Sequence, residues 1–321
     1  MRNSFPKPNI FISKCLGFAN CRWNGEIISD IFVEKLKPFV SYTTTCPECE
    51  IGLGVPRDPI RIVFKKDVYR LMQLNTGRDV TREMDEFSLD YLESLEEIDG
   101  FILKDRSPSC GIKEVKVYPR LDSSAPFKKS SGFFGKAVLN HFPHSAIETE
   151  SRLTNLGIRE HFLTRIFTFA RFRDMASGFK IKNLVQFHAE NKFLLMMYSQ
   201  KELKLMGNIV ANRQKNLPQR VFKTYQEVLY RALNKKPIFT AAINVLMHGL
   251  GYFTKVLKPE EKRFFLNTLE EYRREQIPLS VPLSILHAYA LRHNTSYISQ
   301  QTFLEPFPRA LLGTRDTSKG R

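Results

Sequence analysis

The sequence predicts an α/β domain, with a mostly parallel sheet and helices on both faces, followed by an all-α domain. Short apolar runs alternate with helical patterns up to about residue 120, which is typical of a parallel sheet covered by helices. From about residue 155 the strand patterns stop, and only apolar residues at helical spacing remain. The positive charge is also confined to the second half, so the two halves differ in both pattern and composition.

In the first half, apolar runs predict five strands, and apolar residues at helical spacing predict three helices. Asp79 directly precedes the second helix and is expected to cap it. Residues 123–131 are predicted to form a polar loop, and Pro143 with the polar run 144–154 indicates the end of the domain. The strands are expected at 9–13, 38–43, 60–64, 100–103 and 114–118, and the helices at 27–36, 80–95 and 133–142.

The second half is predicted to be helical throughout. Pro259 suits the first turn of its helix, and Glu260 and Glu261 after it suit the helix dipole. We therefore expect two domains, the first over residues 1–148 and the second over 149–321. The helices of the second domain are expected at 157–172, 182–212, 225–233, 238–256, 259–276 and 282–293.

The net charge of +16 lies almost entirely in the second half. Residues 1–148 contain 21 Lys and Arg against 20 Asp and Glu, whereas residues 149–321 contain 28 against 13. A basic surface can simply keep a protein soluble, but its confinement to one half favours a domain that binds a polyanion. Nucleic acid is the first candidate partner, and an acidic membrane surface is the second.

The chain carries no sign of a membrane or export segment. It contains no run of eighteen apolar residues that would predict a transmembrane helix. No signal-peptide pattern precedes the first predicted strand. We therefore expect a cytoplasmic protein that does not insert into a membrane.

Three of the predicted strands are followed by loops that contain cysteine. Cys15 and Cys21 follow the first strand, Cys46 and Cys49 follow the second, and Cys110 follows the fourth. Five cysteines without a dense framework fit a reducing compartment, with reactive or metal-bound thiols. The ends of strands are a common place for sites in α/β folds, so we expect one thiolate site assembled from the three loops.

The residues alone leave the chemistry of this site open. Together with Cys15 and Cys21, the C-x-x-C segment at 46–49 could hold a structural zinc ion, although the first pair is loosely spaced. Three thiolates from three loops could instead hold a [4Fe–4S] cluster and leave one iron open as a Lewis acid. Glu48 is then either placed for proton transfer or an ordinary loop carboxylate. Cys21 and Cys49 are expected to be inert, small apolar residues.

Several blocks of the first half resemble the thiouracil desulfidase (TudS-like) family. The second half resembles the helical domain that is fused to this family in bacterial tRNA 4-thiouridine desulfidases. The blocks follow the same order and span nearly the whole chain. In the first half they are SKCLG (13–17) with RWNG (22–25), CPE (46–48) with GVPR (54–57), TGRDVT (76–81) and KDRSPSCG (104–111), and in the second half FHAENK (187–192), HGLGYF (248–253), YRR (272–274) and IPLSVP (277–282).

This resemblance implies a cofactor and a ligand set. The cofactor is a [4Fe–4S] cluster, and the implied cluster and metal ligands are Cys15, Cys46 and Cys110. Cys21 and Cys49 lie outside the implied ligand set. The second half is implied to bind tRNA.

The resemblance also implies the reaction. Glu48 and a serine of the SPSC segment, either Ser107 or Ser109, are implied to take part in catalysis. An open iron would bind the thiocarbonyl sulfur of a 4-thiouridine base, and Glu48 would carry the proton while water attacks the ring carbon. The implied activity is therefore a non-redox, hydrolytic desulfidation of tRNA that yields uridine and sulfide.

Two other functions stay open at this point. The protein could be a desulfidase of free 4-thiouracil or its nucleotide, with the helical half in another role. It could also be a non-catalytic RNA-binding protein with a structural zinc ion held by four cysteines.

Overall fold

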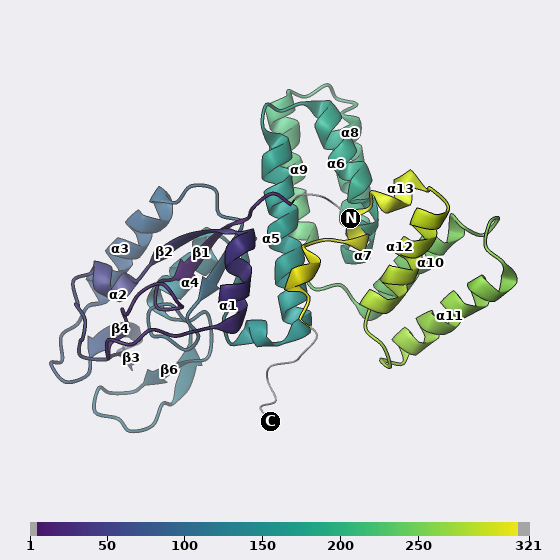
Figure 1. Cartoon of the computed structure of the whole chain (residues 1–321). Coiled ribbons are helices and arrows are strands. Elements are labelled where there is room, and N and C mark those ends of the chain that lie inside the picture. Colours follow the sequence, from purple (N-terminus) through teal and green to yellow (C-terminus); the bar gives the residue numbers. More distant parts are fainter. Residues whose placement is uncertain (1–4, 314–321) are drawn as a thin grey trace. The chain divides into compact units, whose positions relative to one another are not determined.

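The computed structural model describes residues 5–313, which form two compact units (Figure 1). One unit consists of residues 5–170 with 308–313, and the other of residues 171–307. The first contains all the strands among the described residues, and the second is helical. The predicted fold class is thus confirmed. The assignment of separate roles to residues 1–148 and 149–321 stays a prediction.

A four-stranded, entirely parallel sheet forms the centre of the first unit. Its strand order is β2-β1-β5-β8, with β1 (Asn9–Ser13) and β5 (Gly100–Leu103) in the middle and β2 (Ser41–Thr45) at one edge. The strands predicted at 9–13 and 100–103 are confirmed. The strand predicted at 38–43 begins at Ser41 instead, because Lys37–Phe39 forms a short 3₁₀ helix.

The other edge strand, β8 (Ala146–Thr149), was not predicted. It pairs in parallel with β5, from Gly100 opposite Ala146 to Leu103 opposite Thr149. The run 144–154, predicted to be a polar boundary, therefore contains a strand. Only Ala146 and Thr149 of this short edge strand are buried, so it lacks the continuous apolar run of an interior parallel strand.

A second, smaller sheet has the strand order β4-β3-β6-β7. β3 (Ile60–Lys65) and β6 (Val115–Tyr118) confirm the strands predicted at 60–64 and 114–118 to within a residue. β4 (Val68–Gln73) forms a hairpin with β3, and β7 (Lys128–Ser130) lies where a polar loop was predicted. The hairpin turn uses positive φ at two non-glycine residues, Lys66 (51°) and Asp67 (61°), so the sequence carries no Gly signal for it.

Helices cover both faces of the parallel sheet. On one face, Phe11 and Phe101 pack against α3 (Thr81–Ser94) and α4 (Phe133–His141) in one buried cluster. On the other face lies α5 (Leu156–Ala176). Its Ile166 lies so close to Gly100 that a Cβ there would be 2.7 Å from the Cγ2 of Ile166.

The predicted helices of this unit are confirmed with small shifts. α1 (Ile31–Leu36) begins four residues later than predicted, because Asp30 caps it by accepting a hydrogen bond from the N–H of Val33. Asp79 is not the N-cap residue of α3, because that position is Val80. It lies one residue earlier, where its Oδ1 accepts a hydrogen bond of 3.0 Å from the N–H of Thr81.

One apolar core of the helical unit includes Phe193, Leu246, Phe253 and Phe265. No helix in residues 5–313 is long and apolar enough to cross a membrane. The α-helices of the helical unit beyond α5 are α6 (Ile181–Glu190), α7 (Lys192–Tyr198), α8 (Gln200–Ala211), α9 (Pro218–Ala232), α10 (Phe239–Gly251), α11 (Pro259–Arg273), α12 (Ser280–Arg292) and α13 (Ser296–Ser299).

The single helix predicted over 182–212 is wrong, because three helices occupy this segment. The first break is at Asn191, which is buried and whose Oδ1 accepts a hydrogen bond from Thr302 Oγ1. The second is at Ser199, whose side chain caps α8 by accepting a hydrogen bond from the N–H of Glu202. α9 also begins earlier than predicted, at Pro218, which suits the first position of a helix.

Candidate active site

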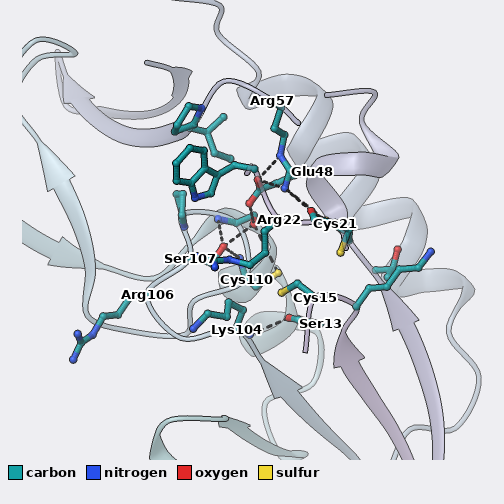
Figure 2. Close-up of a pocket in the computed structure, with 18 of the residues that line it drawn as sticks. Ser13, Cys15, Cys21, Arg22, Glu48, Arg57, Lys104, Arg106, Ser107 and Cys110 are labelled. Atoms are coloured by element: carbon teal, nitrogen blue, oxygen red, sulfur yellow. Dashed lines mark hydrogen bonds and ion pairs between the residues drawn. The ribbon is translucent and has the colours of Figure 1, made fainter. Parts of the chain in front are cut away.

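The three cysteine loops meet at one pocket of about 260 Å³ (Figure 2). β1 ends two residues before Cys15, β2 ends next to Cys46, and Cys110 lies in the loop that follows β5. All three residues line the pocket. Figure 2 shows the sulfur atoms of Cys15 and Cys110 facing the same space. The structure therefore brings together the three predicted ligands from three distant segments.

The thiols are crowded and largely hidden from water. Cys46 and Cys110 are buried, Cys15 is half-buried, and all five cysteines of the chain are free. Burial raises the pKa of the Cys110 thiol to about 12. A hydrogen bond to Cys21, together with burial, raises the pKa of the Cys46 thiol. In the absence of a cation these groups keep their protons, whereas a bound metal favours the thiolates.

Cys21 and Cys49, which were expected to be inert, also lie at this site, and their inertness stays a prediction. A hydrogen bond to the Cys15 thiol raises the pKa of Cys21 to about 11. The Cys49 Sγ accepts a hydrogen bond of 3.6 Å from Nη1 of Arg57. Cys21 lines the pocket, and its carbonyl oxygen accepts hydrogen bonds from the thiols of Cys46 (3.6 Å) and Cys49 (3.8 Å).

The cysteine thiols of this pocket are a donor set that an iron–sulfur cluster can use, because such clusters are held by cysteine thiolates. The irons of a [4Fe–4S] cluster lie at separate corners of a cube, so cysteine ligands approach it from different sides. Three thiols on three loops around one pocket meet that requirement.

Glu48 lies on the wall of the same pocket, in the first turn of the short helix α2 (Pro47–Glu50). Its Oε1 accepts a hydrogen bond of 2.7 Å from Oγ of Ser109. Its Oε2 lies 2.7 Å from Nη2 and 2.9 Å from Nε of Arg57. Both carboxylate oxygens are therefore held in place. Two of the predicted site residues, Glu48 and Ser109, contact each other directly.

The two candidate serines differ in what they contact. Oγ of Ser107 accepts hydrogen bonds from the N–H groups of Ser109 and Cys110, at 3.3 and 3.2 Å, which folds the loop. Ser109 is buried, and its hydroxyl lies between Glu48 and the sulfur of Cys110, 3.7 Å away. The two hydroxyls are 2.9 Å apart. Ser107 thus shapes the loop, and Ser109 contacts the carboxylate.

Arg57 is a site residue that we did not single out from the sequence, although it ends the GVPR segment. Its side chain is 3% exposed, and that of Glu48 is 13% exposed, so the ion pair is buried. Nη2 of Arg57 also donates a hydrogen bond of 3.0 Å to the carbonyl oxygen of Cys21. One guanidinium therefore connects the loop after β1 to the loop after β2. A buried arginine needs such partners, which only the fold reveals.

The loop that carries Cys110 is fixed by the start of α4. The N–H of Gly132 donates a hydrogen bond to the carbonyl oxygen of Gly111 (2.7 Å), and that of Gly135 donates one to Ser109 (2.9 Å). A Cβ at Gly132 would lie 2.5 Å from the carbonyl oxygen of Ser109, so only glycine permits this approach. These hydrogen bonds satisfy the free N–H groups at the start of α4, and they also position the Cys110 loop.

Comparison with known proteins supports a family for each half. Residues 10–150 match the model of a family described as 2-thiouracil desulfurase. Residues 192–308 match the model of a family described as protein of unknown function (DUF1722).

Two curated relatives each match part of the chain. YbbK of Bacillus subtilis (strain 168) is 34% identical over 109 residues, which cover 32% of this chain and 72% of YbbK. YbgA of Escherichia coli (strain K12) is 26% identical over 152 residues, which cover 46% of this chain and 89% of YbgA. Both relatives are described as uncharacterized proteins. Among solved structures, the [4Fe-4S]-dependent thiouracil desulfidase TudS matches with a TM-score of 0.36 and 24% identity, over 48% of this chain and 98% of that one.

The buried pair of Glu48 and Arg57 can be tested by a double-mutant cycle. Arg57→Ala leaves the carboxylate buried without its cation, so we expect the free energy of unfolding to fall by about 3 kcal/mol. Adding Glu48→Gln to Arg57→Ala should restore part of this loss, because no unpaired charge then remains. Urea unfolding of the full-length protein, followed by the fluorescence of its single tryptophan, Trp23, measures both effects. Strictly additive effects of the two substitutions would contradict a direct pair.

Proposed function

The chain belongs to the 2-thiouracil desulfurase family, and from this premise we propose that it is a tRNA 4-thiouridine desulfidase. The proposed reaction converts the thiocarbonyl of 4-thiouridine to the carbonyl of uridine, consumes one water molecule and releases sulfide. The observation that carries the proposal is the pocket that three cysteines from three strand ends line together with Glu48. The basic helical half supports tRNA as the substrate.

We propose a [4Fe–4S] cluster as the cofactor, held by Cys15, Cys46 and Cys110. When bound, the cluster supplies an open, soft Lewis acid that suits the sulfur of the thiocarbonyl group. The buried positions of Cys46 and Cys110 keep the ligands away from solvent oxidants. Cys21 and Cys49 lie beside Cys46 and are not part of the proposed ligand set.

Glu48 is the proton carrier in this proposal. Its carboxylate is oriented by Ser109 on one oxygen and by Arg57 on the other, so little reorganisation is needed when it takes a proton from the attacking water. The hydroxyl of Ser109 donates to Glu48 and lies next to the Cys110 sulfur, where it can pass the proton toward the departing sulfide. We assign Ser109 this role and Ser107 the role of holding the loop.

The mouth of the pocket suits a nucleotide. Trp23 lines it and is 46% exposed, which leaves an aromatic surface available to a planar base. Arg22 and Arg106 also line this pocket, where Arg22 pairs with Glu26 (2.9 Å) and Arg106 with Asp105 (3.5 Å). A base that stacks on Trp23 would present its sulfur to the thiols while its phosphate meets an arginine.

The helical half adds affinity for a polyanion. Residues 149–321 carry 28 Lys and Arg against 13 Asp and Glu, a balance that fits the neutralisation of RNA phosphates. A 4-thiouridine within folded tRNA must leave its stack to reach a pocket of this kind.

A desulfidase of free 4-thiouracil or its nucleotide is the second candidate. The description of the matching family, 2-thiouracil desulfurase, favours it, because that description names a free base. The pocket alone suits both substrates. The two candidates differ in what they require of the helical half.

The first test compares the two substrates directly. For the full-length protein we expect faster turnover of 4-thiouridine in tRNA than of 4-thiouridine 5′-monophosphate at low salt. Rising salt should slow the tRNA reaction steeply. Each phosphate that the protein neutralises releases counterions and contributes a slope of about −0.7 to −0.9 in log affinity against log salt. Sulfide release from each substrate across a salt series measures this. Equal salt dependence of the two reactions, or turnover of the nucleotide alone, would favour the second candidate.

The second test concerns the ligand set. Cys15→Ala, Cys46→Ala and Cys110→Ala should each lose bound iron, acid-labile sulfide and activity. Cys21→Ala and Cys49→Ala should keep most of all three. Glu48→Gln is the matched control, because it removes proton transfer but no ligand, so it should keep the iron and lose turnover.

The bound iron and acid-labile sulfide of each variant are measured after anaerobic purification. Wild-type protein with one zinc ion and no acid-labile sulfide would overturn the desulfidase proposal in favour of an RNA-binding zinc protein. Loss of iron in Cys49→Ala with retention in Cys15→Ala would show that the ligand set is wrong.

A further inference from the structure

A second pocket lies in the helical unit, where α8 and α9 pack together near the loop that joins them. Figure 1 shows this helical hairpin with its connecting loop at one end. The pocket has a volume of about 490 Å³. Its polar lining consists largely of amide and guanidinium side chains, from Asn208, Asn212, Gln214, Asn216, Arg213 and Arg220. Such a lining can donate many hydrogen bonds at once.

The loop of this hairpin is fixed before any ligand binds. Asn212 ends α8 with a left-handed backbone, at a φ of 41°. Its side chain donates a hydrogen bond to the carbonyl oxygen of Asn216 (3.0 Å) and accepts one from the N–H of Asn216 (2.9 Å). Pro218 then sets the first turn of α9. A ligand bound here would therefore cost little ordering of the loop.

The charged residues of the segment that forms this pocket are all cationic. Residues 203–226 contain no Asp or Glu, whereas they contain five cations, Lys204, Arg213, Lys215, Arg220 and Lys223. Four other arginines of the helical unit are paired with carboxylates: Arg231 with Glu202, Arg292 with Glu261, and both Arg273 and Arg274 with Glu270. Within the part of the chain that the structure describes, Arg213 and Arg220 are exposed and have no carboxylate partner.

We propose that this hairpin pocket, formed by α8, α9 and residues 212–217, binds the phosphodiester backbone of RNA. Arg213 and Arg220 each contact one of two neighbouring phosphates, because the planar guanidinium matches a phosphate with two parallel hydrogen bonds. The amides of Asn208 and Gln214 contact the intervening ribose. Contacts of this type position a backbone without reading its bases, which suits an enzyme that must find one modified base in a folded RNA.

This proposal rests on tRNA being the substrate, and its test is chosen to separate the two claims. The probe is unmodified tRNA, whose binding to the full-length protein is measured by fluorescence anisotropy across a salt series. The hairpin variant is Arg213→Ala/Arg220→Ala. The matched control is Lys255→Ala/Arg263→Ala, which removes two exposed cations from another part of the same unit.

The hairpin variant should bind tRNA about tenfold more weakly at moderate salt, and its slope of log affinity against log salt should be shallower by about 1.4 to 1.8, for two lost phosphate contacts. The control should keep a slope near that of wild type. Arg213→Lys/Arg220→Lys keeps the charge and should retain most of the slope. Turnover of 4-thiouridine 5′-monophosphate should be unchanged in all of these variants, since this substrate needs no RNA contact.

Three outcomes would overturn the hairpin site. One is an equal change of slope in the hairpin variant and the control, which would mean that net charge alone matters. Another is wild-type tRNA affinity in the hairpin variant, which would leave the proposed function standing. The third is a hairpin variant that binds tRNA with the wild-type salt slope but loses binding to vesicles of acidic phospholipid. If the wild-type protein released sulfide from the nucleotide and bound no tRNA, the proposed tRNA substrate would fail instead.

Discussion

The parallel pairing of β1 with both β2 and β5 is the constraint on which the site depends. Because Ser13 pairs with Thr45 and Ile12 with Ile102, all three strands run in the same direction and end at the same edge. Their following loops must then leave the sheet side by side. Cysteines that are separated by up to 95 positions in the sequence are thereby placed around one pocket without any long loop having to reach across the molecule.

Two sets of contacts hold the three cysteine loops in place and so define the site. The buried guanidinium of Arg57 ties the carboxylate of Glu48 to the carbonyl oxygen of Cys21, so the first two loops hold each other. The start of α4 holds the third loop through backbone hydrogen bonds to the carbonyl oxygens of Gly111, Pro108 and Ser109. Each arrangement satisfies polar groups that burial would otherwise leave unpaired, so stability and site geometry come from the same contacts.

The sequence predicted those parts that have a strong local pattern. β5 is apolar throughout and β1 is apolar from residue 10 to residue 12, and both were predicted at their observed bounds. The cysteine loops were predicted to form one site because each follows a strand. β8 was missed because it is a short, half-buried edge strand. The helix break at Asn191 was missed because its partner, Thr302, is distant in the sequence. The break at Ser199 was missed because this helix cap lies within an apolar pattern. Arg57 was overlooked for a related reason. Nothing in its local sequence indicates that its partners are Glu48 and the Cys21 carbonyl group, which only tertiary contact brings within 3.0 Å.

The central claim is that this site exchanges the sulfur of a thiolated uracil for oxygen from water, without net oxidation or reduction. The most direct measurement is the mass of the uridine formed when anaerobically purified protein acts on 4-thiouridine in ¹⁸O-labelled water with no added reductant. We expect one ¹⁸O atom in each uridine and one sulfide released per uridine. Turnover that requires a reductant, or uridine without the label, would contradict the central claim.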